Sequence, residues 1–307
     1  MITSIFSKSK PINFIIVFFI IGLACAVAYF KIENNAINIG NALNVGGLFV
    51  VSYFSMLVLN FISSKNNLTR TNNFEILLYG LFLLLIPYAT LNLSVILSNI
   101  FLLFSLRRII SLRSQKNVKK KLFDAAFWIT VASLFYVWTI LFFILMPIAV
   151  RLYTDNKIRN WIIPFAGSLS VLLIAYSVCV IIDFDLMAYV WNGFQLSFDF
   201  SSYNTVSFLV GLTLLLSFGV WSLFFYIKSI NEKKKALRPA LYIIMLVVII
   251  SFLVIVIVPQ KTGSEFLFMF APLAIIITNY IEIIKERWFK EVFLATLIIV
   301  PFILLLL

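Results

Sequence analysis

The chain has 307 residues, of which 63% are hydrophobic and only 12% are charged, and it carries a net charge of +12 without a single histidine. This composition leaves too little polar surface to cover a soluble core, which excludes an ordinary soluble globule. The lack of histidine excludes Ser-His and Cys-His nucleophile pairs, imidazole zinc sites and bis-histidine haem ligation. We therefore predict an all-α polytopic membrane protein with one integral-membrane domain, residues 1–307.

The N-terminal stretch MITSIFSKSKPINFIIVFFIIGLACAVAYF begins like a signal peptide, but its apolar run from Ile12 to Phe30 is too long for one. We expect a retained first span, with Lys8 and Lys10 at its cytoplasmic end. The break PYATLN within residues 74–106 predicts a hairpin of two short helices. The other apolar runs are 45–64, 125–150, 161–182, 205–227, 240–258, 264–283 and 291–307.

The uncharged stretch Ala125–Val150 decides the topology, because it is long for one crossing of ~20 residues and short for two. If it crosses twice, 22 of the 24 lysines and arginines are cytoplasmic, and only Lys31 and Lys261 lie outside. If it crosses once, the split becomes 12 against 12. Positive residues in short loops favour the cytoplasmic side, so we predict a second short hairpin over 125–150. About eleven membrane helices result, with the N-terminus inside and the C-terminus outside a bacterial inner membrane.

The loop RRIISLRSQKNVKKK holds the densest cluster of positive charge. It could bind anionic lipid headgroups or a protein partner, although anchoring of the topology alone also explains it. Because basic loops are the usual topology signal, we expect no nucleic-acid partner. Asp124, which follows the loop, is expected to cap the first turn of the hairpin 125–150. The patch consists of Arg107, Arg108, Arg113, Lys116, Lys119, Lys120 and Lys121.

The segment DFDLMAYVWNGFQLSFDFSSYN, residues 183–204, is the richest predicted external stretch. As a helix it would align four large side chains on one face, suited to the outer headgroup layer. These are Met187, Trp191, Phe194 and Phe198. The segment either covers a lipid or sugar substrate, with Asp183 or Asp185 binding it, or forms an interfacial aromatic belt.

Candidates for substrate or lipid binding on this predicted external side are Asp183, Asp185, Trp191, Lys261 and Glu265. Carboxylates near a lysine could hold a divalent ion or a phosphate, but Lys261 and Glu265 could equally form a surface ion pair. No spacing matches a metal motif, so we predict no metal and no cofactor. We also expect no ionisable residue at mid-membrane depth and no buried acid, which argues against a transporter.

The two predicted hairpins are ILLYGLFLLLIPYATLNLSVILSNIFLLFSLRR and FDAAFWITVASLFYVWTILFFILMPIAVRLY. Together with the following RNWIIPFAGSLSVLLIAY they resemble the membrane module of the GT-C glycosyltransferases, which use polyprenyl-phosphate-linked sugars. The stretch PQKTGSEFLFMFAPLAIIITNY is similar to the external lysine and apolar run of the aminoarabinose-transferase branch. The resemblance covers residues 12–182 and 259–280. The opening MITSIFSKSKPINFIIV also resembles an uncharacterised family of Bacteroidota inner-membrane proteins.

The GT-C resemblance implies Glu33 as the catalytic candidate, because it is the sole acid of the first external loop, KIENNAINIGNALN. It also implies that Lys261 contacts the donor phosphate. The loop is shorter than the usual one of the superfamily and has no room for the amphipathic helices that usually follow. That departure weighs against catalysis.

Three functions stay open. The short external loop and the lack of histidine favour a non-catalytic multi-pass inner-membrane subunit or scaffold of a cell-envelope assembly, with membrane lipids and other membrane proteins as partners. The resemblance implies a polyprenyl-phosphate-dependent glycosyltransferase instead. The number of spans alone suggests a lipid or solute transporter. We place the scaffold ahead of the transferase, so an enzyme is not the leading expectation.

Overall fold

The computed structural model describes residues 2–32, 38–154, 157–259 and 261–305, and among these the regular structure is helical without any strand. Seven of the described helices are long and apolar enough to cross a membrane, so the chain is a helical, multi-pass membrane protein by the length and composition of its helices. Two further apolar helices, Phe74–Leu85 and Val137–Tyr153, are shorter. Eleven crossings and the orientation stay predictions. The seven are Pro11–Ile32, Ile39–Asn66, Leu93–Ser114, Ile158–Ile181, Val206–Ile230, Arg238–Ile257 and Ser264–Ile283.

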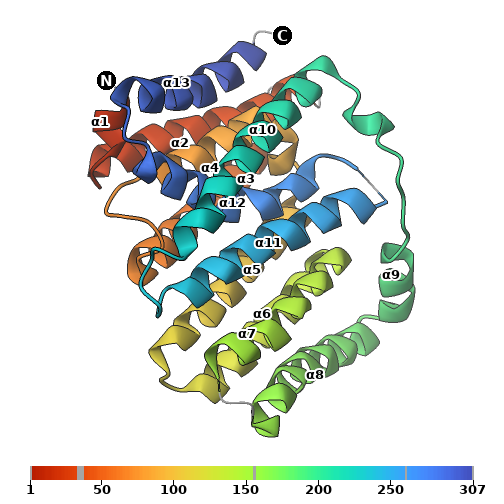
Figure 1. Cartoon of the computed structure of the whole chain (residues 1–307). Coiled ribbons are helices and arrows are strands. Elements are labelled where there is room, and N and C mark those ends of the chain that lie inside the picture. Colours follow the sequence, from red (N-terminus) through yellow and green to blue (C-terminus); the bar gives the residue numbers. More distant parts are fainter. Residues whose placement is uncertain (1, 33–37, 155–156, 260, 306–307) are drawn as a thin grey trace. The chain divides into compact units, whose positions relative to one another are not determined.

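Figure 1 shows the helices in chain order. They are α1 (Ile2–Phe6), α2 (Pro11–Ala26), α3 (Ile39–Asn66), α4 (Phe74–Leu85), α5 (Leu93–Ser111), α6 (Val118–Phe135), α7 (Leu145–Tyr153), α8 (Ile158–Ile181), α9 (Leu186–Gly193), α10 (Val206–Ile230), α11 (Arg238–Ile257), α12 (Leu267–Ile283) and α13 (Arg287–Leu304). A π-helix, Val27–Ile32, continues α2. Turns of 3-10 helix occur at Pro87–Thr90, Leu112–Ser114, Val137–Ile144, Ser201–Tyr203 and Ser264–Phe266.

The chain forms two compact units. Unit 1 comprises Met1–Ile96, Phe200–Lys234 and Lys261–Leu307, and unit 2 comprises Leu97–Asp199 and Lys235–Gln260. Each unit is described by itself below. The single integral-membrane domain expected from the sequence stays a prediction.

Helices α4 and α12 form the core of unit 1. Every residue of α4 is buried, and so is every residue of α12 from Leu267 to Ile281. A helix that is apolar on all sides is stable only when other helices surround it, and here α2, α3, α12 and α13 pack against α4. The 12 residues of α4 span only about 18 Å, so this helix cannot cross a bilayer alone and depends on its neighbours for shielding.

Two glutamates are buried in this core, and they contradict the expectation that no acid is buried. Glu75 lies in the first turn of α4 and is 1% exposed. Glu282 lies in the last turn of α12, and its side chain is 4% exposed. Each is a single ionisable residue at the end of a long apolar run. The mean hydropathy of the run stays high, so the sequence pattern does not reveal the glutamate.

The connections of unit 1 gather at two opposite ends. At the end that we call the basic end, the Asn73 N–H donates to the Phe6 carbonyl at 3.0 Å, and Asn279 Nδ2 donates to the Leu68 carbonyl at 2.9 Å. At the other end, which we call the pocket end, Lys31 Nζ donates to the Leu305 carbonyl at 2.6 Å. Loops predicted to be cytoplasmic thus meet at one end of this unit and loops predicted to be external at the other. The side of the membrane that each end faces stays a prediction.

The stretch Ala125–Val150 reverses direction within unit 2. Helix α6 ends at Phe135, and the backbone of the next residue, Tyr136, is extended with φ −148° and ψ 103°. The chain returns through the 3-10 segment and α7, and Gln115 Nε2 donates to the Tyr153 carbonyl at 2.5 Å. Helix α7 therefore ends beside the basic loop that precedes α6, as a hairpin requires. Two membrane crossings by this hairpin stay a prediction.

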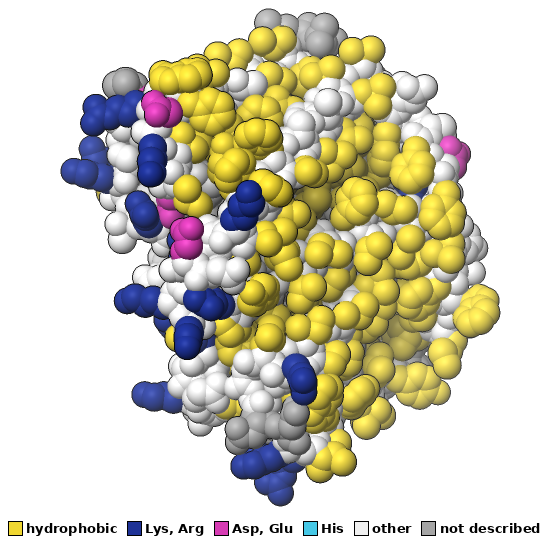
Figure 2. Space-filling view, viewed as in Figure 1, with side chains coloured by type: hydrophobic (Ala, Val, Ile, Leu, Met, Phe, Trp, Pro, Cys, Tyr) yellow, Lys and Arg dark blue, Asp and Glu magenta, His cyan; other side chains and the backbone are white. Residues whose placement is uncertain are grey.

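Hydrophobic side chains cover the flanks of the helices in the face shown in Figure 2, while lysine and arginine side chains lie at helix ends and in connections. Helix α8 is an extreme case, since only one narrow stripe of it is buried and it packs against α6. The rest of its apolar surface is exposed, as expected for contact with lipid. The buried stripe consists of Asn160, Pro164, Gly167 and Val171.

Replacing Gly167 by alanine should destabilise unit 2. The added Cβ would lie 2.6 Å from the backbone oxygen of Phe123 in α6, and backbone cannot move aside as a flexible side chain can. We expect the free energy of unfolding to fall by about 1–3 kcal/mol, measured by thermal unfolding of the purified protein in detergent.

Gly46→Ala is the matched control, because this helical glycine of α3 has no atom within 4 Å of the added Cβ. Alanine there should stabilise the protein by roughly 0.5–1 kcal/mol. Equal unfolding temperatures for the two variants would show that α6 and α8 do not pack this closely.

Candidate functional site

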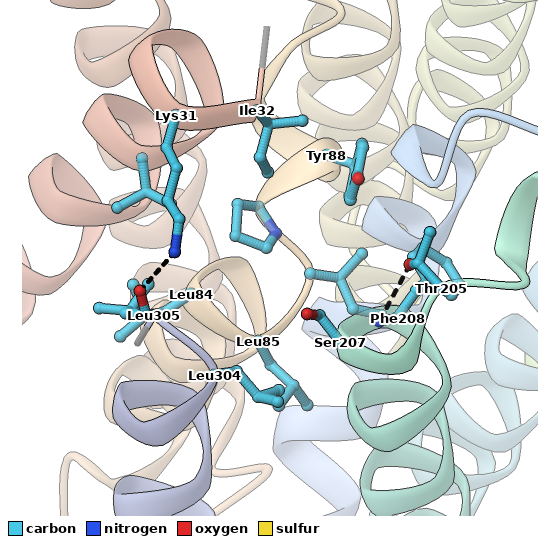
Figure 3. Close-up of a pocket in the computed structure, with 13 residues that line it drawn as sticks. Lys31, Ile32, Leu84, Leu85, Tyr88, Thr205, Ser207, Phe208, Leu304 and Leu305 are labelled. Atoms are coloured by element: carbon cyan, nitrogen blue, oxygen red, sulfur yellow. Dashed lines mark hydrogen bonds between the residues drawn. The ribbon is translucent and has the colours of Figure 1, made fainter. Parts of the chain in front are cut away.

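A pocket of about 230 Å³ lies at the pocket end of unit 1 (Figure 3). The end of α2, the turn after α4, the start of α10 and the end of α13 surround it. Its walls are mainly apolar, and among the described residues no carboxylate lines it. Its polar groups are the Lys31 ammonium and the hydroxyls of Tyr88, Thr205 and Ser207.

Local sequence signals place these hydroxyls. Helix α4 ends at Leu85 because Pro87 has no backbone N–H to donate, and the 3-10 turn that Pro87 begins carries Tyr88 to the pocket. Thr205 caps α10, and its hydroxyl accepts a hydrogen bond from the Phe208 N–H at 3.4 Å. Ser207 therefore stands in the first turn of α10, where it lines the pocket.

Lys31 gives the pocket its positive charge. It lies at the end of the π-helix that continues α2, and Figure 3 shows its side chain reaching toward Leu305 at the end of α13. The hydrogen bond to the Leu305 carbonyl, at 2.6 Å, uses one of the three ammonium donors. The residue is exposed, so the other two donors remain accessible to an anion.

A buried carboxylate supports one wall of the pocket. Glu265 is fully buried and accepts hydrogen bonds from the Tyr203 hydroxyl, from the Gly263 N–H at 3.1 Å and from the Thr262 hydroxyl at 3.3 Å. The Tyr203 ring stacks on Phe208, a pocket residue, with 4.5 Å between the ring centroids. Three donors compensate the carboxylate, so Glu265 acts as a structural anchor for this wall.

Lys261 is buried as well, at 4% exposure, and its Nζ lies 4.5 Å from the centroid of the Phe200 ring. The predicted surface ion pair between Lys261 and Glu265 is therefore wrong, since neither side chain is at the surface. Both side chains are shielded from water in the folded chain, Lys261 under the Phe200 ring and Glu265 among its hydrogen-bond donors. Contact of Lys261 with a donor phosphate stays a prediction.

The candidates Asp183 and Asp185 belong to unit 2, where both shape the chain locally. Asp183 follows α8 with a positive φ of 51°, and the Asp185 carboxylate caps α9 by accepting a hydrogen bond from the Ala188 N–H at 2.9 Å. Trp191 of α9 is 82% exposed. Binding of a substrate or lipid by these residues stays a prediction.

The predicted helical stripe from Met187 to Phe198 is wrong beyond Gly193, where α9 ends. Two tertiary contacts explain the early end. A Cβ at Gly193 would lie 2.8 Å from Val137, and the Phe194 ring packs edge-on against Trp138 at 5.6 Å between centroids. The contact with the 3-10 segment of the hairpin therefore prevails over the helical period of the sequence.

The basic patch of unit 2 divides into two groups. Some of its residues hold the turn between α5 and α6, since Arg108 pairs with Asp124 at 3.1 Å and Lys121 Nζ donates to the Ser111 carbonyl at 2.5 Å. Asp124 is thus not the predicted helix cap, because α6 begins six residues earlier, at Val118. The ion pair with Arg108 of α5 compensates the negative charge of Asp124 within α6.

Other members of the patch face a second pocket, of about 610 Å³, in unit 2. Lys119 and Lys120 reach it from the start of α6, and Lys157 reaches it from the start of α8. The remaining lining residues are Gln115, Asn117, Val118, Thr154 and Asn160. The three lysines give this pocket a positive charge. Binding of anionic lipid at these loops stays a prediction.

The sequence pattern named none of the four polar residues of the first pocket as site residues: Lys31, Tyr88, Thr205 and Ser207. Lys31 was expected only as one of the two external basic residues. The PYATLN break and a threonine just before an apolar run were the only local signals for the other three. Glu33, the catalytic candidate, lies outside the described residues, although Ile32, which precedes it, lines the pocket.

Neither a curated protein nor a solved structure matches the chain. One family model does match, and it spans residues 1–306, nearly the whole sequence. The chain therefore belongs to the DUF6427 family, which is described as a family of unknown function.

Proposed function

We propose that the chain is a non-catalytic multi-pass subunit of a cell-envelope assembly in the bacterial inner membrane, and that it binds a phosphate-bearing lipid at the pocket end of unit 1. The observation that carries this proposal is a single accessible ammonium, that of Lys31, at an apolar-walled pocket formed by helix ends. A lipid phosphate matches these groups, since the ammonium and hydroxyls can donate to it while its hydrocarbon chain contacts the apolar wall.

The chemistry of the described pocket supports binding rather than catalysis. General acid–base work is done most often by histidine, aspartate or glutamate, and none of these lines the pocket among the described residues. Among the described acids, Glu265 supports the pocket wall through Tyr203, which stacks on Phe208, and its carboxylate is occupied by its own donors. The distribution of basic residues supports an external position for the pocket, since the connections that form it carry only Lys31 and Lys261.

Farnesyl phosphate, a short polyprenyl phosphate, tests the proposal on the purified protein in detergent. It should raise the unfolding temperature of the wild-type protein, whereas farnesol, which lacks the phosphate, should not. Lys31→Gln should weaken this binding about tenfold or more, the effect of one charge-assisted hydrogen bond of ~1.5–3 kcal/mol.

Lys10→Gln is the matched control for that experiment, because Lys10 is an exposed lysine just before α2 at the basic end. It should bind farnesyl phosphate as the wild-type protein does. Equal responses to farnesol and farnesyl phosphate, or undiminished binding by Lys31→Gln, would refute the proposal.

One observation favours a polyprenyl-phosphate-dependent glycosyltransferase as the second candidate. Ile32 lines the pocket, and Glu33, the candidate acid, is the next residue in the chain. A transferase should lose transfer in Glu33→Gln while it keeps farnesyl phosphate binding. A binding subunit with this variant should instead complement a knockout fully, and it should crosslink to other membrane proteins in intact cells.

A further inference from the structure

A second polar site lies at the basic end of unit 1, between α4 and α12. Three side-chain oxygens in it are buried and accept no hydrogen bond from the described residues. They are Glu75 Oε2, Glu282 Oε2 and Thr278 Oγ1, from residues whose side chains are at most 4% exposed. The pocket described above is at the opposite end of the same unit.

Helix register places these oxygens at the same end of the two helices, within about one turn of one another. Helices α4 and α12 run antiparallel, since the Phe82 and Phe270 rings pack at 5.7 Å and Asn72, just before α4, bonds to Glu282 near the end of α12. Glu75 lies two turns before Phe82 on the same face of α4. On α12, Thr278 lies about two turns after Phe270, and Glu282 lies one turn further on. The carboxylates of Glu75 and Glu282 are close enough to interact electrostatically.

The two carboxylates differ in how they are compensated. Glu282 Oε1 accepts hydrogen bonds from the Arg70 N–H at 2.7 Å and from Asn72 Nδ2 at 2.6 Å, and Arg70 Nε lies 3.9 Å from Oε2. In the described part of the chain, no basic side chain forms an ion pair with Glu75. A buried carboxylate without a counter-charge is strongly unfavourable, so Glu75 has to be neutralised in the folded protein, either by a proton or by a cation beside it.

The charged groups on the neighbouring elements do not supply that charge. Lys290 of α13 lies over the Phe74 ring, 5.2 Å from the centroid, and its charge interacts with Glu282. Arg70 and Lys233 interact with Glu282 as well. None of these side chains forms an ion pair with Glu75 in the described part of the chain, so neutralisation is left to a bound cation, a proton included.

We propose that Glu75, Thr278 and Glu282 form a site for one monovalent cation, Na⁺ or a proton, that enters from the basic end. Carboxylate and hydroxyl oxygens suit such a hard cation, and one positive charge neutralises the carboxylate that has no protein partner. Ionisable groups in membrane segments commonly mark ion pathways. Because the site joins α4 to α12, occupancy stabilises the core of unit 1. This inference is independent of lipid binding at the pocket end.

The test measures thermal unfolding of the purified protein in lipid nanodiscs. In one arm NaCl replaces choline chloride at constant ionic strength and pH, and in the other the pH varies in choline chloride alone. If Na⁺ binds, the unfolding temperature of the wild-type protein rises with NaCl. If a proton binds, it falls as the pH rises, because the folded state holds the proton more tightly than the unfolded state.

Glu75→Gln should lose the response, since the amide is neutral and needs no cation. Glu286→Gln is the control, because Glu286 is an exposed glutamate directly before α13, and it should respond as the wild-type protein does. Thr278→Val, which keeps both charges, should weaken a Na⁺ response and leave a proton response intact. The proposal is overturned if the wild-type protein responds to neither Na⁺ nor pH, or if Glu75→Gln and Glu286→Gln respond alike.

Discussion

Replacing Glu265 by alanine is expected to lower the free energy of unfolding by about 3 kcal/mol. The variant would leave the Tyr203 hydroxyl and the Gly263 N–H buried without an acceptor, each at a cost of roughly 1–3 kcal/mol. Thr262 loses less, because its hydroxyl is also 2.7 Å from that of Ser264. Equilibrium unfolding in mixed micelles, followed by tryptophan fluorescence, would measure the loss.

Two companion variants calibrate this result. Glu286→Ala removes an exposed carboxylate and should change the free energy of unfolding by no more than about 0.5 kcal/mol. Tyr203→Phe removes one donor and should have an intermediate effect of about 1 kcal/mol. If Glu265→Ala were as stable as Glu286→Ala, Glu265 would not be the anchor of the pocket wall.

Gly263→Ala is the second substitution with a large expected effect, a loss of about 2–5 kcal/mol of unfolding free energy. Gly263 has a φ of 89°, a left-handed conformation that costs an L-residue roughly 1–2 kcal/mol. The added Cβ would also lie 2.9 Å from the Phe208 ring and 3.0 Å from Tyr88 Cβ, and such overpacking costs about 1–3 kcal/mol. Thermal unfolding in detergent measures the loss.

Because Phe208 and Tyr88 both line the pocket, Gly263→Ala should weaken farnesyl phosphate binding as well. Gly47→Ala is the control, since nothing lies within 4 Å of its added Cβ in α3, and it should keep binding and be slightly more stable than the wild-type protein. Wild-type stability and binding in Gly263→Ala would contradict the close contact between this loop and the pocket.

The helices themselves were largely predictable, because long apolar runs and their breaks are local properties of the sequence. The prediction of a reversal within Ala125–Val150 came from counting basic residues, and the extended Tyr136 is where the chain turns. The break after α4 was predictable because Pro87 cannot continue the hydrogen bonds of a helix.

The pocket was not predictable, because its polar residues come from distant parts of the chain and a single sequence gives no distances between them. Lys31 and Leu305 meet although 274 positions separate them. The buried state of Glu75 depends on helices that surround α4, and the end of α9 depends on Phe194 packing against Trp138. These outcomes are set by tertiary contacts and override the local pattern.

The claim that the pocket opens to the external side and binds a lipid phosphate can be tested at Ser207, which lines the pocket and is partly exposed. Cysteine would be introduced there after Cys25 and Cys179 are replaced by alanine, and in a second protein at Lys234, an exposed residue just after α10. We predict that a membrane-impermeant maleimide added from the periplasmic side labels Ser207→Cys and that farnesyl phosphate slows this labelling. Lys234→Cys should react only after the inner membrane is disrupted. Labelling of Ser207→Cys only after disruption, or at a rate that farnesyl phosphate does not change, would contradict the claim.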